Sequence, residues 1–168
     1  MKRQHAATRF SFLLFAIFFI LTSCQFSKGV KKDLNTGLSA SYNGLTIDDI
    51  FLTDEGGKRL SNNKIKLGEK VLMVVNGVDY FTVQEGKVFP GCQIILTDKD
   101  KKELLNLPDA FADQTNGTTP AEAKTLQASL NTGQPMVSGA TYHLLVRFYD
   151  KKDKEKNILS DVDLVMQD

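Results

Sequence analysis

Apolar and polar positions alternate along much of the chain from about residue 38 onward, a pattern typical of half-buried β-strands. The clearest cases predict a long strand over residues 142–148 and a last strand over residues 158–166. Residues 70–75 read KVLMVV, which is apolar at successive positions and so indicates a central strand covered on both faces.

The pair Asn76-Gly77 follows that central strand. Asn-Gly between apolar runs predicts a hairpin with a type I′ turn, because both turn residues need a positive φ. The expected partner strand covers residues 78–83, and shorter strands are expected near residues 45–52 and 93–97. Short strands separated by frequent turn signals predict an all-β fold, an Ig-like antiparallel β-sandwich.

One short helix is expected near residues 120–125. Thr119-Pro120-Ala121-Glu122 combines an N-cap residue, a proline at the first helical position and the glutamate of a capping box. The stretch before it, residues 106–119, is the longest without a periodic pattern, and two interpretations of this loop remain open. Loops of this length are often functional, but a crossover between the two sheets of a sandwich also needs one.

A local repeat links residues 50–62 with residues 94–106, which are identical at seven of thirteen positions without gaps. Residues 148–159 carry a looser echo of the same pattern. The repeat reflects either an ancient duplication or the repeated use of one hairpin chemistry, in which aspartate begins the turn and lysines protect exposed edges.

The N-terminus has the charge and hydropathy of a secretory signal. Lys2, Arg3 and Arg9 precede an apolar run over residues 10–21, and no acidic residue lies among them. A run of this length is too short to span a bilayer core, which takes about 20 apolar residues, but it suits the apolar region of a signal peptide.

The run ends in Leu21-Thr22-Ser23-Cys24, which resembles the lipobox of bacterial lipoproteins. The resemblance implies cleavage between Ser23 and Cys24, followed by attachment of lipid to Cys24 and so of the protein to a membrane. Gln25 stands where aspartate signals inner-membrane retention in some of these bacteria, so the resemblance points to the outer membrane. The expected division is a signal peptide over residues 1–23, the lipidated cysteine with a flexible tether over 24–37, and one domain over 38–168.

Composition narrows the classes of function. Without residues 1–23 the chain keeps 18 basic and 20 acidic residues, so its formal charge is 18 − 20 = −2. A near-neutral chain of mixed sign lacks the basic footprint of a nucleic-acid-binding protein. Cys92 is then the only thiol other than the lipidated residue, so no disulfide within the chain is expected.

Candidate catalytic residues are few, and we predict that the domain is not an enzyme. His143 is the only histidine after cleavage, and it shares a strand face with Leu145, Arg147 and Tyr149. A solvent-facing histidine is the favoured interpretation, and only a cleft holding it beside a carboxylate and a hydroxyl would favour a hydrolase. Cys92 precedes an apolar strand and is interpreted as a small buried hydrophobe.

Two binding chemistries were weighed. Asp98, Asp100 and Glu103 are candidate calcium ligands, but three lysines are interleaved with them, so solvated turns are favoured and no cofactor or metal is expected. Sugar binding would use aromatic platforms, although the chain has no tryptophan and its aromatic residues fit a core better. The candidate platforms are Tyr80, Phe81, Tyr142 and Tyr149.

The sequence as a whole predicts a lipid-anchored binding or accessory module of the bacterial envelope. Its expected partner is an envelope protein or a polysaccharide, with no nucleic acid. An envelope hydrolase with an unrecognised site and a purely structural spacer remain as alternatives.

Overall fold

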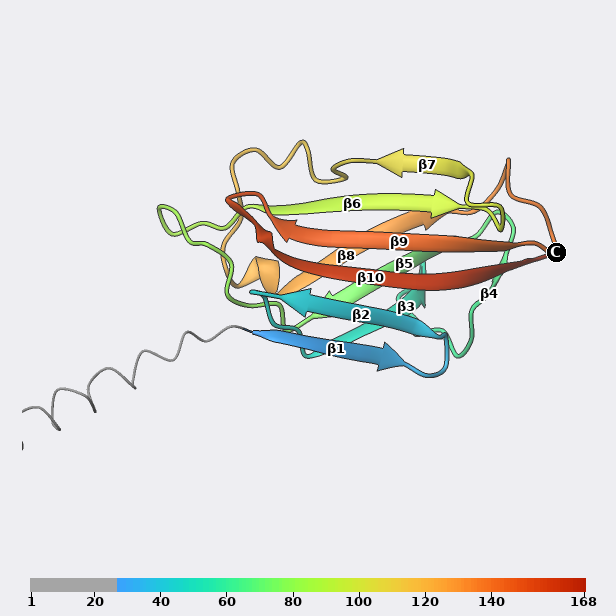
Figure 1. Ribbon diagram of the computed structural model, residues 1–168, viewed down its shortest axis with the longest axis horizontal. Coiled ribbons are helices and arrows are strands. Elements are labelled where there is room, and N and C mark those ends of the chain that lie inside the picture. The colour runs from blue at the N-terminus through green and yellow to red at the C-terminus, as the bar shows by residue number, and fades with distance from the viewer. Residues whose placement is uncertain (1–26) are drawn as a thin grey trace, which may run out of the picture.

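Two β-sheets pack face to face in the computed structural model, which describes residues 27–168 (Figure 1). The first five strands are β1 (Lys28–Asp33), β2 (Leu38–Asn43), β3 (Asp49–Asp54), β4 (Lys64–Lys66) and β5 (Lys70–Asn76). The other five are β6 (Pro90–Thr97), β7 (Glu103–Leu107), β8 (Thr125–Asn131), β9 (Thr141–Asp150) and β10 (Asp153–Gln167).

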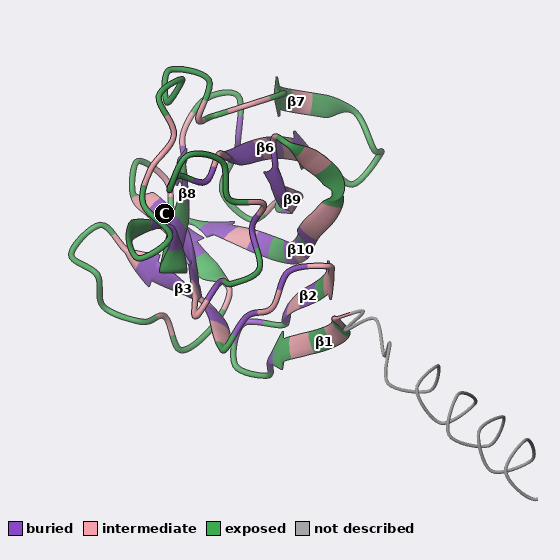
Figure 2. Ribbon diagram, turned by 90° about the vertical axis from the view of Figure 1, so that its left-hand side faces the viewer, coloured by how far each residue is buried: buried purple, intermediate pink, exposed green. Residues whose placement is uncertain are grey.

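The larger sheet has the strand order β1-β2-β10-β9-β6-β7, and the smaller sheet has the order β3-β5-β8. All of these neighbours are antiparallel, while β4 adds to the end of β10 as a short parallel strand. Figure 2 shows the larger sheet curving past one side of the smaller sheet. The all-β antiparallel sandwich predicted from the sequence is therefore confirmed.

The core lies between the sheets and draws most heavily on β9 and β10, which form the longest ladder. Because side chains of a strand point alternately to its two faces, every second residue along most of β9 and β10 enters the core. The predicted inward faces of both strands are confirmed by burial. The buried residues are Tyr142, Leu144, Val146 and Phe148 on β9, and Ile158, Val162, Leu164 and Met166 on β10.

The predicted flexible tether is wrong from residue 28 onward, because Lys28–Asp33 forms strand β1 at the edge of the larger sheet. The sequence of β1, KGVKKD, is polar and carries little alternation. Its order comes from backbone pairing with β2 along six residues rather than from a buried apolar face. The folded domain therefore starts about ten residues earlier than the sequence pattern indicates.

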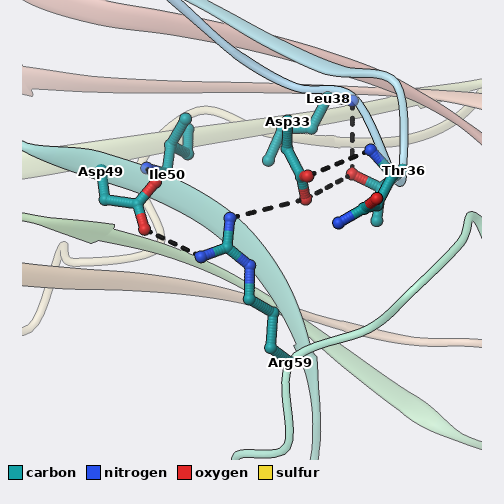
Figure 3. Close-up of polar contacts among 7 residues, drawn as sticks. Asp33, Thr36, Leu38, Asp49, Ile50 and Arg59 are labelled. Atoms are coloured by element: carbon teal, nitrogen blue, oxygen red, sulfur yellow. Dashed lines mark hydrogen bonds and ion pairs between the residues drawn. The ribbon is translucent and has the colours of Figure 1, made fainter.

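A polar cluster secures the end of β1 to the opposite sheet (Figure 3). Asp33 is buried, and its carboxylate accepts hydrogen bonds from the Asn35 N–H (3.2 Å) and the Thr36 hydroxyl (3.0 Å). The Arg59 guanidinium lies 3.8 Å from the Asp33 carboxylate and 2.9 Å from the Asp49 carboxylate, at the start of β3. This bridge ties both sheets together and satisfies a carboxylate that would be costly to bury alone.

The hairpin predicted at Asn76-Gly77 is also wrong. Both edges of β5 are already occupied at Asn76, which pairs with Asp49 of β3 on one side and Thr125 of β8 on the other. Gly77 does take the positive φ of a turn residue, +70°, but the chain then leaves the sheet, and residues 78–83 form a loop. Asn76 has no positive φ and remains in β5, so the type I′ turn is absent together with the pairing that it implied.

The expected short helix is present as one 3-10 turn over Glu122–Lys124. Thr119 and Glu122 form the reciprocal bonds of a capping box: the Glu122 carboxylate accepts from the Thr119 N–H (2.9 Å), and the Thr119 hydroxyl accepts from the Glu122 N–H (3.2 Å). Bonds from the Thr118 hydroxyl and from Thr119 lower the pKa of Glu122 to about 2. The loop before this turn links β7 of the larger sheet to β8 of the smaller one, so it is a sandwich crossover.

The repeated segments share one turn geometry. In each segment, the backbone N–H of an aspartate donates to the carbonyl of the lysine four residues later (3.0 Å in both). The backbone N–H of that lysine donates in turn to the aspartate carboxylate (2.9 and 3.0 Å). The residue three places after the aspartate has a positive φ in both turns. The residues are Asp54, Gly57 and Lys58 in one turn and Asp98, Lys101 and Lys102 in the other. Shared turn chemistry gives the repeat a local explanation, and duplication stays a hypothesis.

Candidate binding groove

A row of polar side chains crosses the outer face of the larger sheet. It lies near the end of the sheet that is opposite to Lys28. Thr97 on β6, His143 on β9 and Asp163 on β10 are direct partners in the antiparallel register. Residues paired in this way lie on the same face of a sheet. They line a hollow of about 520 Å³, here called the distal groove, together with Asp98, Lys99, Lys101 and Thr141.

His143 and Asp163 are in direct contact in the distal groove, with 2.9 Å between the histidine Nδ1 and a carboxylate oxygen. Because an ionised carboxylate can only accept, Nδ1 carries the proton, and in the neutral ring Nε2 is the atom that can accept a hydrogen bond from a ligand. Both side chains are well exposed, at 44% and 64%. The prediction of a solvent-facing histidine is confirmed, and the carboxylate beside it was not predicted.

A second hollow of about 640 Å³ adjoins the distal groove and shares Asp98, Lys99 and Thr141 with it. Its other wall is the loop before β9, where the Val137 side chain is 58% exposed. The Tyr142 hydroxyl accepts a hydrogen bond from the Val137 N–H (3.0 Å) and so fixes this loop against the core. The two hollows together offer a ligand both charged groups and an apolar rim.

The three calcium candidates do not form a metal site. Asp98 accepts bonds from the N–H groups of Asp100 and Lys102 within its own turn. Glu103 accepts one from the side chain of Asn106. Within residues 27–168 no group of three or more histidine, cysteine or acidic side chains is arranged to hold a metal ion.

The distal groove meets part of the condition that would favour a hydrolase, since it holds His143 beside a carboxylate and two threonines. The remaining condition is a nucleophile bonded to the histidine. In the described part of the chain no hydrogen bond joins His143 to the hydroxyl of Thr97 or Thr141, and its contact is with Asp163. Because the pair is also open to water, both side chains are accessible for hydrogen bonding to a ligand.

Cys92 is fully buried in the core, as its apolar surroundings in the sequence predict. Burial, with a smaller contribution from the nearby Asp109 carboxylate, raises the pKa of the Cys92 thiol to about 12. Thiol reactivity depends on the thiolate, so burial and the raised pKa both disfavour reaction at Cys92.

The four candidate aromatic platforms do not gather on one surface. Phe81, Tyr142 and Tyr149 are buried, whereas Tyr80 is 54% exposed and lies in the loop after β5. Tyr149 covers Gly91 of β6, where an added Cβ would meet its ring at 2.4 Å. The interpretation of most of these aromatics as core or core edge is confirmed.

The predicted cleavage and lipidation residues, Ser23 and Cys24, lie outside the described residues. In residues 27–168 we find no helix with the length and apolar character needed to cross a bilayer. The resemblance to bacterial lipoproteins therefore remains a prediction from the sequence.

No protein-family model and no curated protein matches this chain. Among solved structures it resembles the C-terminal domain of wzt, with a TM-score of 0.50 and 10% identity over 86% of this chain and 80% of that one. Two others share less: the soluble domain of PmoD from Methylocystis sp. ATCC 49242 (Rockwell) has a TM-score of 0.37, 9% identity and coverage of 82% and 95%. An AA10 lytic polysaccharide monooxygenase from Streptomyces lividans has a TM-score of 0.35, 14% identity and coverage of 66% and 62%. At 10% identity, the similarity to the C-terminal domain of wzt shows a shared fold.

Proposed function

We propose that this protein is a lipid-anchored binding module of the bacterial envelope, not an enzyme, and that the distal groove is its ligand surface. The expected location is the outer membrane, through lipid on Cys24. The observation that carries this proposal is the position of the groove relative to the start of the fold, because a module tethered at one end can present a ligand site at the other.

The chain enters the sandwich at Lys28, four positions after Cys24. The distal groove surrounds the beginning of β9, whereas β9 ends at the same end of the larger sheet at which β1 starts, as Figure 1 shows. A strand rises about 3.4 Å per residue, so the ten residues of β9 span roughly 30 Å. A membrane-held Lys28 would therefore point the groove away from the bilayer.

The lining of the groove supports a polar ligand or partner. Lys99 and Lys101 supply donors, Asp163 supplies acceptors, and Val137 adds exposed apolar surface at the rim. Such a mixture serves the polar rim of a protein interface as well as a polysaccharide rich in hydroxyl groups. Both remain the candidate ligand classes, and the low net charge does not favour nucleic acid.

The anchor is tested by one substitution. Cys24→Ala is expected to abolish incorporation of radiolabelled palmitate and to leave the precursor uncleaved, because the sulfur that receives the lipid is gone. Labelling in growing cells and the mobility of the protein on a gel measure both effects. Continued labelling of the alanine variant would contradict the lipoprotein assignment.

The groove is tested by capture from detergent-solubilised envelope, with proteins identified by mass spectrometry and polysaccharide by sugar analysis. His143→Ala combined with Lys101→Glu is expected to reduce retention of the ligand at least about tenfold, which corresponds to about 1.4 kcal/mol of binding free energy. Lys152→Ala, at the opposite end of the sandwich, is the control and should retain the ligand like the unmodified protein.

Equal retention by all three proteins would mean that the distal groove is not the ligand surface. The same preparations should also be assayed against ester, glycoside and peptide substrates. Turnover that disappears in the variant with both His143→Ala and Lys101→Glu but persists in Lys152→Ala would instead support the hydrolase alternative.

A further inference from the structure

The end of the sandwich where the chain enters carries a protruding loop with exposed apolar side chains. This loop, residues 79–87, extends beyond the sheets on the side of the start of β1 (Figure 1, green). Tyr80 and Val83 are 54% and 56% exposed, although both are large hydrophobic side chains. Both side chains are accessible for contact with a partner or with a membrane.

The loop is held in position by bonds to the end of β9 and the beginning of β10. The Asp150 carboxylate accepts from the Thr82 N–H (2.6 Å), and the Lys156 ammonium donates to the Tyr80 carbonyl (2.9 Å). Farther out, Gln84 and Lys87 exchange both backbone hydrogen bonds (2.8 and 2.9 Å). These bonds fix the backbone of the loop, and the Tyr80 side chain lines a hollow together with Asn43 and Lys156.

The length of chain before the fold limits what this loop can face. Only residues 25–27 separate Cys24 from Lys28. Four residues of fully extended chain reach at most about 14 Å. A lipid on Cys24 would therefore keep this end of the sandwich within about that distance of the bilayer surface.

The charge at this end is balanced. Residues 79–89 and 150–156 together contain five lysines and five acidic residues. Attraction to anionic headgroups needs an excess of basic residues, so a contact made here would depend on apolar side chains. Tyrosine suits that role, because its ring is apolar and its hydroxyl remains hydrogen-bonded at the depth of the headgroups.

We propose that the loop over residues 79–87 is a membrane-contact surface, with Tyr80 and Val83 entering the headgroup region of the phospholipid bilayer that holds the lipid on Cys24. This inference rests on the proposed lipid anchor and adds an orientation to it. The loop faces the membrane, and the distal groove faces away from it.

The test uses the full-length lipidated protein, reconstituted into vesicles of phosphatidylethanolamine and phosphatidylglycerol that contain a headgroup-nitroxide lipid. Val83→Cys and Val137→Cys each receive an environment-sensitive fluorophore. The two valines are matched in type and in exposure, at 56% and 58%, and lie at opposite ends of the sandwich. Cys92 is buried with a pKa of about 12, and lipid on Cys24 blocks its thiol, so in the lipidated protein only the introduced cysteine is labelled.

Quenching by the nitroxide lipid is expected to be several-fold stronger at position 83 than at position 137, and to persist at high salt. Equal quenching at both positions would overturn the proposed orientation. Loss of the difference at high salt would overturn the apolar contact. Mass spectrometry of the same protein separates the two proposals: if Cys24 carries lipid and position 83 is not quenched, the loop contact fails while the anchor stands, and if Cys24 carries none, both fail.

Discussion

Replacing Leu164 with alanine is expected to lower the free energy of unfolding by about 2–5 kcal/mol. Leu164 is fully buried on the inward face of β10, opposite Tyr142 of β9. Its removal loses apolar contacts and leaves a cavity in a region where two long paired strands have little freedom to collapse. Chemical denaturation of residues 25–168 in solution measures the loss.

Leu159 is the matched control, because it lies on the same strand with the opposite orientation and is 39% exposed. Leu159→Ala is expected to cost less than about 1 kcal/mol, in line with surface substitutions outside the core. Similar losses for the two variants would mean that the assignment of faces on β10 is wrong.

The strands that could be predicted from the sequence are those whose burial alternates strictly. On β9 and β10 each buried side chain alternates with a more exposed one through most of the strand, so periodicity identifies the core face directly. The capping box at Thr119 and Glu122 was equally accessible, because its bonds join residues three apart. Local chemistry decides both features, and local chemistry is visible in a sequence.

Features that depend on distant partners were missed. Strand β1 forms through backbone pairing with β2 and through the ion pair between Asp33 and Arg59. The sequence KGVKKD contains no pattern that predicts either interaction. Asn76-Gly77 was misinterpreted for a related reason. Gly77 does have a positive φ, but Asn76 stays in β5, and the neighbours of β5 are β3 and β8.

The candidate site shows how an irregularity defeats prediction. Asp150 pairs with Asp153, and a ladder continued without interruption would bring His143 opposite Ser160. The ladder shifts between Asp153 and Asn157, so Tyr149 pairs with Asn157 and His143 pairs with Asp163 instead. A shift of three residues also exchanges the two faces of the strand. The outward position of His143 was predictable, and the carboxylate beside it depended on this bulge.

The carboxylate of Asp150 should matter nearly as much to stability as a core leucine. Asp150 is fully buried and accepts hydrogen bonds from two backbone N–H groups, those of Thr82 (2.6 Å) and Lys152 (2.8 Å). Hydrogen bonds to charged groups are worth about 1.5–3 kcal/mol each, and a buried donor left unpaired carries a further cost. Asp150→Ala removes both acceptors at once, so we expect a loss of about 3 kcal/mol.

Two further variants separate the bonds from the charge. Asp150→Asn keeps one acceptor oxygen and should lose roughly half as much stability, while Asp163→Ala, at a carboxylate 64% exposed, should change stability by less than about 0.5 kcal/mol. Hydrogen exchange gives a local measurement, because the amides of Thr82 and Lys152 should exchange faster in Asp150→Ala than in the Asp163→Ala control. Unchanged exchange at Thr82 would show that the loop over residues 79–87 is held without Asp150.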